Sequence, residues 1–284
     1  MGLKELLNAE YSQSGAASDG GDIQKVQGEA LVVFDAFKQV CDKHGIVYMM
    51  GGGSALGTVR HNGFIPWDDD IDINMPRDDF ERFKTVSGEL GDGFVFCAPN
   101  YKDTAVERFG KIIARNGSED TDWLHNTAID IFVIENLPKN AIHRKIKGVI
   151  STFGMGLAAV SQFYHSRDAK LKKLLCRSFK GKISYYSRVV LGFFISFIPT
   201  VKLYNFADRL NQYRKKTGFS GVPSGRKHYF GEQFPTGVYL PVREGSFEGR
   251  TVPLENNVEL YLTNLYGKDY MQIPPEHQRE RHIR

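Results

Sequence analysis

The sequence predicts an α/β or α+β protein built around one compact module. Three observations support this prediction. Helical and extended patterns alternate along residues 23–140, a basic and helical segment follows over residues 141–217, and residues 218–284 are rich in Gly, Pro, Tyr and Phe. With 284 residues, 41% hydrophobic and 25% charged, the chain is long enough to bury a sizeable core. Three scattered cysteines show no metal-ligand spacing and fit a reducing cytosol.

The first half of the module contains two predicted helices and one strand. Residues 1–22 precede it, and their small, polar, glycine-rich composition predicts a flexible lead-in. Apolar side chains recur at helical spacing over Ile23–His44. Ile46–Met50 predicts a short strand that leads directly into GGGS. Ser54 is expected to cap a short helix over Ala55–Arg60.

The second half of the module is richer in strands. Ile71–Met75 alternates with period two and predicts a strand, and Asp78 then opens a helix that continues to Leu90. Three further strands are predicted at Phe94–Pro99, Phe109–Arg115 and Thr127–Leu137.

Four aspartates are crowded into the stretch WDDDIDI, at Asp68, Asp69, Asp70 and Asp72. Like charges at this density repel each other and need a compensating cation. Asp70 and Asp72 are two residues apart, so on a strand both project from the same face and can converge on a divalent cation. Asp68 lies just before them, and Asp69 is expected to face the other way. A donor set of oxygens alone, without His or Cys, points to Mg²⁺ or Mn²⁺.

Two nearby features extend this candidate metal site. Asp130 stands alone in the apolar stretch AIDIFVI, where a carboxylate is costly unless it is paired or bound to metal. It is therefore the candidate third acid, as a metal ligand or as a base. The glycines of GGGS have two interpretations: a tight turn, or a loop whose backbone N–H groups approach a phosphate at a helix N-terminus.

Three cationic side chains are candidates for binding phosphate oxygens. Arg60 follows the short helix, Arg77 follows the aspartate strand, and Lys111 lies in FGKIIAR. Phosphoryl transfer depends on positioning and charge stabilisation, so such cations are expected near the aspartates. Each arginine has the alternative role of a surface ion pair.

The segment over residues 141–217 carries sixteen Lys and Arg against two acids, a local charge of +14. Three interpretations remain open: a solvated helical hairpin packed on the module, a nucleic-acid-binding surface, or an element at the surface of an anionic membrane. The nucleic-acid interpretation lacks any recognised binding motif. The longest apolar run, Val189–Pro199, has about half the ~20 residues of a membrane-spanning helix.

The stretch GGGSALGTVRHNGFIPWDDDIDINMPRDDFERF, together with AIDIFVIENLP, resembles the signature of the LicD family. This family belongs to the nucleotidyltransferase-fold superfamily and is related to fukutin and fukutin-related protein. The tail from FEGRTVPL to QRERH is similar more loosely, and the basic middle only poorly. The resemblance implies an α+β fold with a nucleotidyltransferase-like small mixed sheet flanked by helices. Residues 23–140 would be the catalytic core, residues 141–217 a basic helical insertion at a membrane or acceptor, and residues 218–284 the completion of the catalytic domain.

The resemblance also implies roles for individual residues. Gly52, Gly53 and Ser54 would fill the glycine-serine loop of the superfamily. Asp70 and Asp72 would form its metal-binding D-x-D pair. The remaining family acids match Asp130 on the following strand and Asp68 after the tryptophan. The interval between the loop and the D-x-D pair is longer than usual in the superfamily, which leaves the register of Asp68 open.

The implied activity is the transfer of a phospho-alcohol, such as phosphocholine, from its CDP derivative to a glycan hydroxyl, with release of CMP. The cofactor would be Mg²⁺ or Mn²⁺, and the acceptor a cell-surface glycan or its lipid-linked precursor. A cytoplasmic enzyme, peripheral on the inner face of the membrane and without a nucleic-acid partner, is expected. Two alternatives stand beside it: a true nucleotidyltransferase that moves NMP from an NTP, and a non-enzymatic calcium-binding adaptor.

Overall fold

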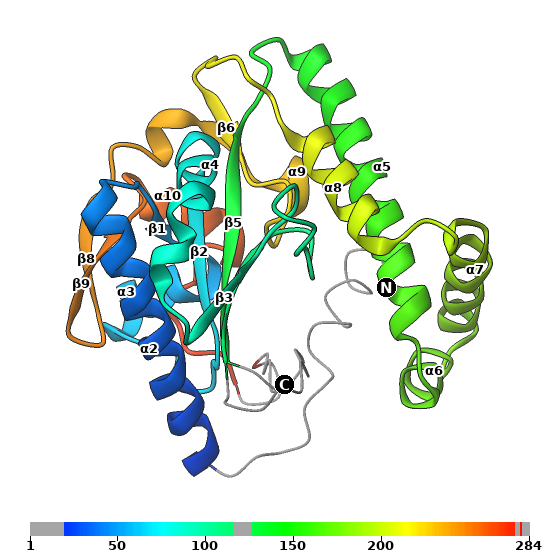
Figure 1. Cartoon of the computed structure of the whole chain (residues 1–284), viewed down its shortest axis with the longest axis horizontal. Helices are drawn as coiled ribbons and strands as arrows, with labels where there is room; N and C mark the ends of the chain where they lie inside the picture. Colours follow the sequence, from blue (N-terminus) through cyan, green and yellow to red (C-terminus); the bar gives the residue numbers. More distant parts are fainter. Residues whose placement is uncertain (1–19, 116–126, 276–278, 280–284) are drawn as a thin grey trace.

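A computed structural model of the chain describes residues 20–115, 127–275 and 279. Within these ranges the fold is α+β, as predicted: helices flank one mixed sheet, and a helical segment separates two of its strands (Figure 1). Most of the predicted lead-in, residues 1–19, lies outside the described residues.

The sheet is mixed because one central strand pair is parallel while its neighbours are antiparallel. The strands lie in the order β1-β2-β5-β4-β3, and β6 pairs with the end of β5 on one side and with β7 on the other. Only β2 and β5 run parallel within this described sheet. The strands are β1 (Met49–Met50), β2 (Ile71–Pro76), β3 (Phe94–Cys97), β4 (Gly110–Ala114), β5 (Ala128–Asn136), β6 (Phe219–Gly221) and β7 (Gln233–Pro235).

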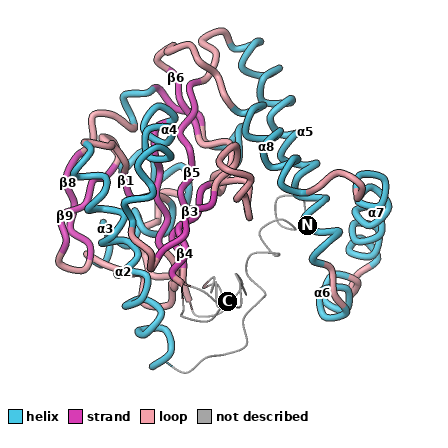
Figure 2. Tube along the Cα trace, viewed as in Figure 1, coloured by secondary structure: helices cyan, strands magenta, loops and turns pink. Residues whose placement is uncertain are grey.

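One face of the sheet is apolar and is covered by helices, as Figure 2 shows for α2 and α4. Phe37 of α2 and Phe83 of α4 stack edge to face at 5.3 Å between ring centroids. They belong to the same buried cluster as Ile73 of β2 and Ile131 of β5. Side chains alternate along a strand, so Asp72 and Asp130 project from the opposite face. The helices of this half are α2 (Gly20–His44), α3 (Gly52–His61), α4 (Arg77–Val86) and the 3₁₀ turn η1 (Ser87–Leu90).

The basic segment forms four helices, in agreement with its predicted helical character. In Figure 1, α8 lies between α5 and the sheet, and α7 lies on the far side of α5. Within the described residues no single helix is long and apolar enough to cross a membrane; α7 and α8 pass that test only as a pair bent by 98°. The helices are α5 (Ala141–Ser166), α6 (Ala169–Leu175), α7 (Phe179–Ile195) and α8 (Thr200–Asn211).

The C-terminal part packs back onto the first module. Phe247, Val252 and Leu262 join the same buried cluster as α2 and β2. The predicted turn-rich character holds for the connections, but the part also contains a hairpin and a helix. Its elements after β6 are α9 (His228–Gly231), β7, η2 (Thr236–Val238), β8 (Arg243–Phe247), β9 (Arg250–Leu254) and α10 (Val258–Tyr266).

Most predicted elements are found with shifted ends, and one predicted cap is wrong. The strand over Ile46–Met50 is reduced to β1, and α3 begins at Gly52 rather than Ala55. The N-cap of α3 is Gly51, without a side-chain cap. Ser54 lies inside the first turn instead, where its hydroxyl accepts a hydrogen bond from the Asp72 N–H at 2.9 Å. The Ser54 hydroxyl therefore bonds to a distant strand and does not form the helix cap that the sequence predicts.

Candidate active site

Four carboxylates line one wall of a large cavity on the polar face of the sheet. Asp72 on β2 and Asp130 on β5 are direct neighbours in the parallel register. Asp68 and Asp70 come from the loop that leads into β2, and all four line a cavity of about 1310 Å³. The structure thus brings together the four acids that the sequence marked as candidate metal ligands.

The carboxylates repel one another strongly in this wall. Burial raises the pKa of Asp68 well above its ordinary value, and the charges of Asp70 and Asp72 raise it further. Burial likewise raises the pKa of Asp72, with further contributions from Asp70 and Asp130. Asp69 does not line the cavity, yet one of its oxygens lies within 4.8 Å of oxygens of Asp68 and Asp70. It therefore adds negative charge to the cluster.

These residues fit a divalent cation. The cluster offers carboxylate oxygens only, which are the ligands that Mg²⁺ and Mn²⁺ prefer. Burial first, and the charges of the neighbouring acids second, raise the pKa of Asp68 and Asp72, and a bound divalent ion would offset this repulsion. Oxygens of Asp68, Asp69 and Asp70 lie within 4.8 Å of one another, and Asp72 and Asp130 line the same wall. The sequence prediction assigns the ion to Asp68, Asp70 and Asp72, with Asp130 beside them.

The glycine loop is shaped by these carboxylates. A Cβ atom on Gly52 would lie 2.6 Å from an Asp72 carboxylate oxygen, and one on Gly53 would lie 2.7 Å from an Asp68 oxygen. Gly52 also has a φ of +44°, in the left-handed region that side chains disfavour. Both glycines line the cavity, whereas Ser54 does not. The glycines thus admit the acids against the start of α3, and Ser54 fixes the Asp72 backbone.

A buried polar network supports the loop from behind. The Gly52 N–H donates to the Tyr261 hydroxyl of α10 at 3.1 Å. The Asn74 side-chain amide donates to the same hydroxyl at 2.9 Å and to Glu255 at 3.0 Å. Because Asn74 lies two residues after Asp72 on β2, this network fixes both the glycine loop and β2 to the C-terminal part.

We expect Gly53→Ala to weaken divalent-metal binding about tenfold or more, because the added Cβ displaces the Asp68 carboxylate. Gly156→Ala is the matched control, since its Cβ would meet nothing within 4 Å. Titration calorimetry with Mn²⁺ measures both affinities. Equal affinities for the two variants would contradict the placement of Asp68 among the metal-binding residues.

We expect the pH dependence of stability to change in Glu255→Gln. Burial raises the pKa of Glu255 to about 8 from 4.5, so the folded protein retains a proton that the unfolded chain releases. The stabilisation from Glu255 is therefore complete below about pH 4.5 and is lost as pH rises toward 8. The variant should gain on wild type by up to about 1.4 kcal/mol per pH unit across this window. Urea unfolding at several pH values measures the gain. Glu244→Gln, at an exposed position, is the control, and parallel curves for Glu255→Gln and wild type would contradict the prediction.

Two of the three predicted cations lie at the cavity. Lys111 of β4 is the cross-strand neighbour of Asp130, and its ammonium lies 2.5 Å from an Asp130 oxygen. Arg60, at the end of α3, lines the cavity and donates to the backbone oxygens of Tyr270 and Gln272. Burial lowers the pKa of Arg60. Lys111 thus neutralises part of the acidic wall, and Arg60 ties the C-terminal part to the site.

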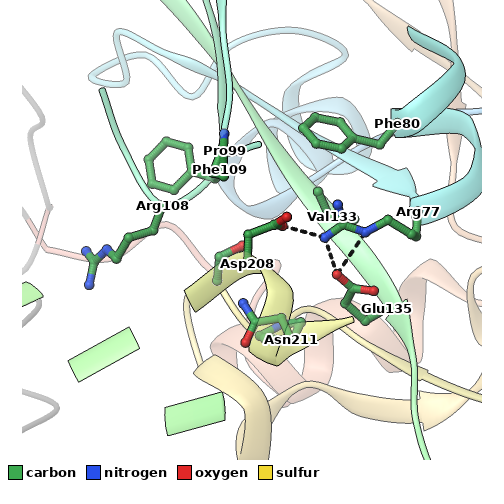
Figure 3. A pocket seen from close by; sticks show the side chains of 11 residues that line it. Arg77, Phe80, Pro99, Arg108, Phe109, Val133, Glu135, Asp208 and Asn211 are labelled. Carbon is green, nitrogen blue, oxygen red and sulfur yellow. Dashed lines mark hydrogen bonds and ion pairs between the residues drawn. The ribbon is translucent and has the colours of Figure 1, made fainter. Parts of the chain in front are cut away.

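The structure does not bring Arg77 to the carboxylates. Its guanidinium donates to Glu135 of β5 and to Asp208 of α8, as the dashed lines in Figure 3 show. Glu135 lies an odd number of residues after Asp130 on β5, so its side chain projects from the other face of the sheet. Arg77 is therefore a buried ion-pair residue, and its expected contact with phosphate is not supported by this geometry.

Several residues that line the cavity were not predicted from the sequence. Arg226, in the loop before α9, lines the cavity, and its positive charge offsets a small part of the rise in the pKa of Asp72. The turn signal of PSG before Arg226 was the one local hint, and it does not reveal proximity to residues 68–72. The helical segment supplies the facing wall: Ala159, Gln162, Phe163, His165 and Ser166 of α5, Leu171 of α6, and Thr200, Val201 and Tyr204 of α8.

Comparison with known proteins finds a match over the part of the chain that carries these carboxylates. Residues 45–152 match the family model described as LicD/FKTN/FKRP, nucleotidyltransferase domain. This match contains GGGS, the aspartate cluster and Asp130.

Curated relatives extend the likeness along the chain. The lipopolysaccharide cholinephosphotransferase LicD of Haemophilus influenzae is 27% identical over 275 residues, which cover 92% of this chain and 95% of the relative. Uncharacterized proteins of Rickettsia typhi and Rickettsia prowazekii are 36% and 39% identical over 61 and 54 residues, about a fifth of each chain. Residues 45–152 thus match the LicD/FKTN/FKRP nucleotidyltransferase domain, and nearly the whole chain is similar to a LicD cholinephosphotransferase.

Proposed function

We propose that the chain transfers phosphocholine, or a similar phospho-alcohol, from a CDP-alcohol to a hydroxyl of a cell-surface glycan or its lipid-linked precursor. The LicD/FKTN/FKRP domain match and the full-length similarity to a cholinephosphotransferase support the prediction of a transferase enzyme. The observation that carries the finer proposal is the wall of four carboxylates beside Lys111 in one large cavity. Such a wall fits a pyrophosphate donor that is bound through a divalent cation.

The cavity is large enough for a donor and part of an acceptor together. Its volume of about 1310 Å³ exceeds the roughly 300–1,000 Å³ of ordinary small-molecule sites. Its sheet wall is acidic, whereas the facing wall of α5 and α8 offers polar and aromatic groups such as Gln162 and Tyr204. We assign the donor's phosphates to the sheet wall and the glycan acceptor to the helical wall.

The proposed reaction is an in-line displacement at the phosphorus that bears the alcohol. The acceptor hydroxyl forms a new O–P bond, the bond from this phosphorus to the CMP oxygen breaks, and CMP leaves. Mg²⁺ or Mn²⁺, held by Asp68, Asp70 and Asp72, would supply charge neutralisation on the pyrophosphate oxygens. Asp130 would take the hydroxyl proton, and Lys111, whose ammonium lies 2.5 Å from an Asp130 oxygen, would orient it.

A donor screen tests this proposal. The chain is incubated with Mg²⁺ or Mn²⁺ and CDP-choline, CDP-ethanolamine, CDP-ribitol or CDP-glycerol, and thermal shift identifies the donor that stabilises the fold most. The selected donor is then supplied with lipopolysaccharide oligosaccharide, and mass spectrometry follows acceptor modification and CMP. Metal-dependent release of CMP with a modified acceptor is the expected result.

Two other outcomes would replace the proposal. Pyrophosphate release from an NTP, with no reaction of any CDP-alcohol, would assign a nucleotidyltransferase. Calcium binding without transfer from any donor would assign a non-enzymatic adaptor.

A further inference from the structure

Helix α5 carries an apolar stripe that nothing covers among the described residues. Ile142, Ile146, Val149, Ile150 and Phe153 follow each other at spacings of three, four and one residues, which places them on one side of a helix. Their exposed fractions run from 42% for Ile150 to 70% for Ile142. The opposite side is buried at Gly148, Ser151 and Met155, among others. The stripe is thus the outer face of a helix whose inner face is already packed.

Helix α7 repeats this pattern more strongly. Its exposed apolar side chains recur at helical spacing along the whole helix. Phe197, two residues after the end of α7, continues the same pattern. Gly181, Tyr185, Arg188 and Gly192 form the buried face on the other side. The exposed stripe consists of Phe179, Ile183, Tyr186, Val190, Phe193, Phe194 and Phe197, with exposed fractions from 50% to 79%.

We call these two stripes together the apolar platform. Large exposed apolar side chains in such number on two packed helices are rare in soluble monomers, so the platform marks a binding surface. Helix α7 packs on the side of α5 that faces away from the sheet, as Figure 1 shows. The platform is therefore separate from the carboxylate wall.

Basic side chains border the platform, and their positive charge favours an anionic partner. Lys180 and Lys182 are exposed and lie on either side of the α7 stripe by helical spacing. The Lys172 ammonium of α6 lies 5.7 Å from the centre of the Tyr186 ring within the stripe. A second copy of this chain would bring the same excess of positive charge to the contact, which disfavours self-association. An anionic lipid surface offers both apolar depth and negative charge.

We propose that the apolar platform binds the surface of a bilayer that contains anionic lipid, with α7 lying in the interface. Its aromatic and aliphatic side chains enter the acyl boundary while Lys172, Lys180 and Lys182 remain at the headgroups. The other side of α5 lines the cavity through Gln162 and Phe163. Because α7 packs on the outer side of α5, a bilayer bound at α7 lies about two helix diameters, roughly 20 Å, from the cavity wall. The proposal does not depend on the identity of the donor.

Vesicle flotation of the full chain tests the proposal. Vesicles of phosphatidylcholine alone are compared with vesicles that contain phosphatidylglycerol at about one third of the lipid, a composition with a strong negative surface potential. Wild type should float with the anionic vesicles. The double variant Phe194→Ser with Phe197→Ser should lose about tenfold or more in partitioning, because it removes two apolar anchors. Lys180→Gln with Lys182→Gln should lose about fivefold for each lysine and show a weaker salt dependence.

Matched controls keep folding separate from binding. Val32→Ser with Leu260→Ser removes apolar side chains that are 60% and 45% exposed but lie outside the platform, and it should float like wild type. Thermal melts of all variants should agree, since every altered side chain is exposed. Absence of flotation with anionic vesicles would overturn the proposal, as would partitioning unchanged by the phenylalanine variant. A stable dimer in sedimentation velocity that the phenylalanine variant dissociates would assign the platform to self-association instead.

Discussion

Asp72→Asn should lower the rate of phospho-alcohol transfer by about 10²- to 10³-fold or more while the fold is retained. The substitution removes a carboxylate that lies beside Asp130 on the cavity wall, and electrostatic contributions of this kind are worth several kcal/mol in a transition state. It also removes one charge from a cluster of like charges, so the metal-free variant should be at least as stable as wild type.

The comparison that checks this prediction uses CMP release for activity and urea unfolding for stability. Asp78→Asn is the control, since Asp78 is 67% exposed and forms a surface ion pair with Lys216. In wild type, added Mn²⁺ should raise the free energy of unfolding, whereas in Asp72→Asn the same Mn²⁺ should have little effect. An active Asp72→Asn variant would remove Asp72 from the metal site. A variant that is both inactive and unfolded would assign it a structural role.

Arg77→Ala should destabilise the fold by about 3–5 kcal/mol, which is the usual cost of removing one partner from a buried ion pair. The guanidinium is 12% exposed and holds Glu135, 1% exposed, and Asp208, 5% exposed. Without it, two buried acids from β5 and α8 lose their shared cation. The loss should separate the helical segment from the sheet as well as lower global stability.

Arg82→Ala provides the contrast for this measurement. Arg82 is also on α4, but it is 55% exposed and pairs with Asp79 at the surface, so its loss should cost only about 0–1 kcal/mol. Chemical denaturation at neutral pH measures both variants. A cost for Arg77→Ala as small as that for Arg82→Ala would show that the buried cluster contributes no net stability.

The sequence was informative where local pattern and tertiary structure agree. The period-two alternation at residues 71–75 and the solitary Asp130 predicted two strands with acids on one face, and the parallel register of β2 and β5 places these acids side by side. Local reasoning could not predict that Ser54 would bind the Asp72 N–H, because the partner is 18 residues away. Arg77 was placed correctly after the strand, but its partners are 58 and 131 residues away. Arg226 was missed for the same reason.

The basic segment shows the same limit from another side. Composition predicted helices and left three partners open. The structure shows which side of each helix is packed: α5 packs against α8, and α7 packs against Tyr164 of α5. The exposed positions on α5 and α7 follow from these contacts. Amphipathic spacing alone does not say which stripe faces solvent, because both a core and a membrane can cover an apolar stripe.

The pairing of Asp72 with Asp130 makes the site sensitive to the alignment of the whole sheet. In a strand, a slip of one residue turns every side chain to the opposite face. A misaligned β2 would bring Ile71 or Ile73 to the cavity and press Asp72 into the apolar layer against α2 and α4. A molecule with a misaligned β2 therefore lacks the site altogether and does not retain partial activity. The catalytic activity of a refolded sample is therefore proportional to the number of molecules with correctly aligned strands. A refolding assay that follows turnover measures that number directly.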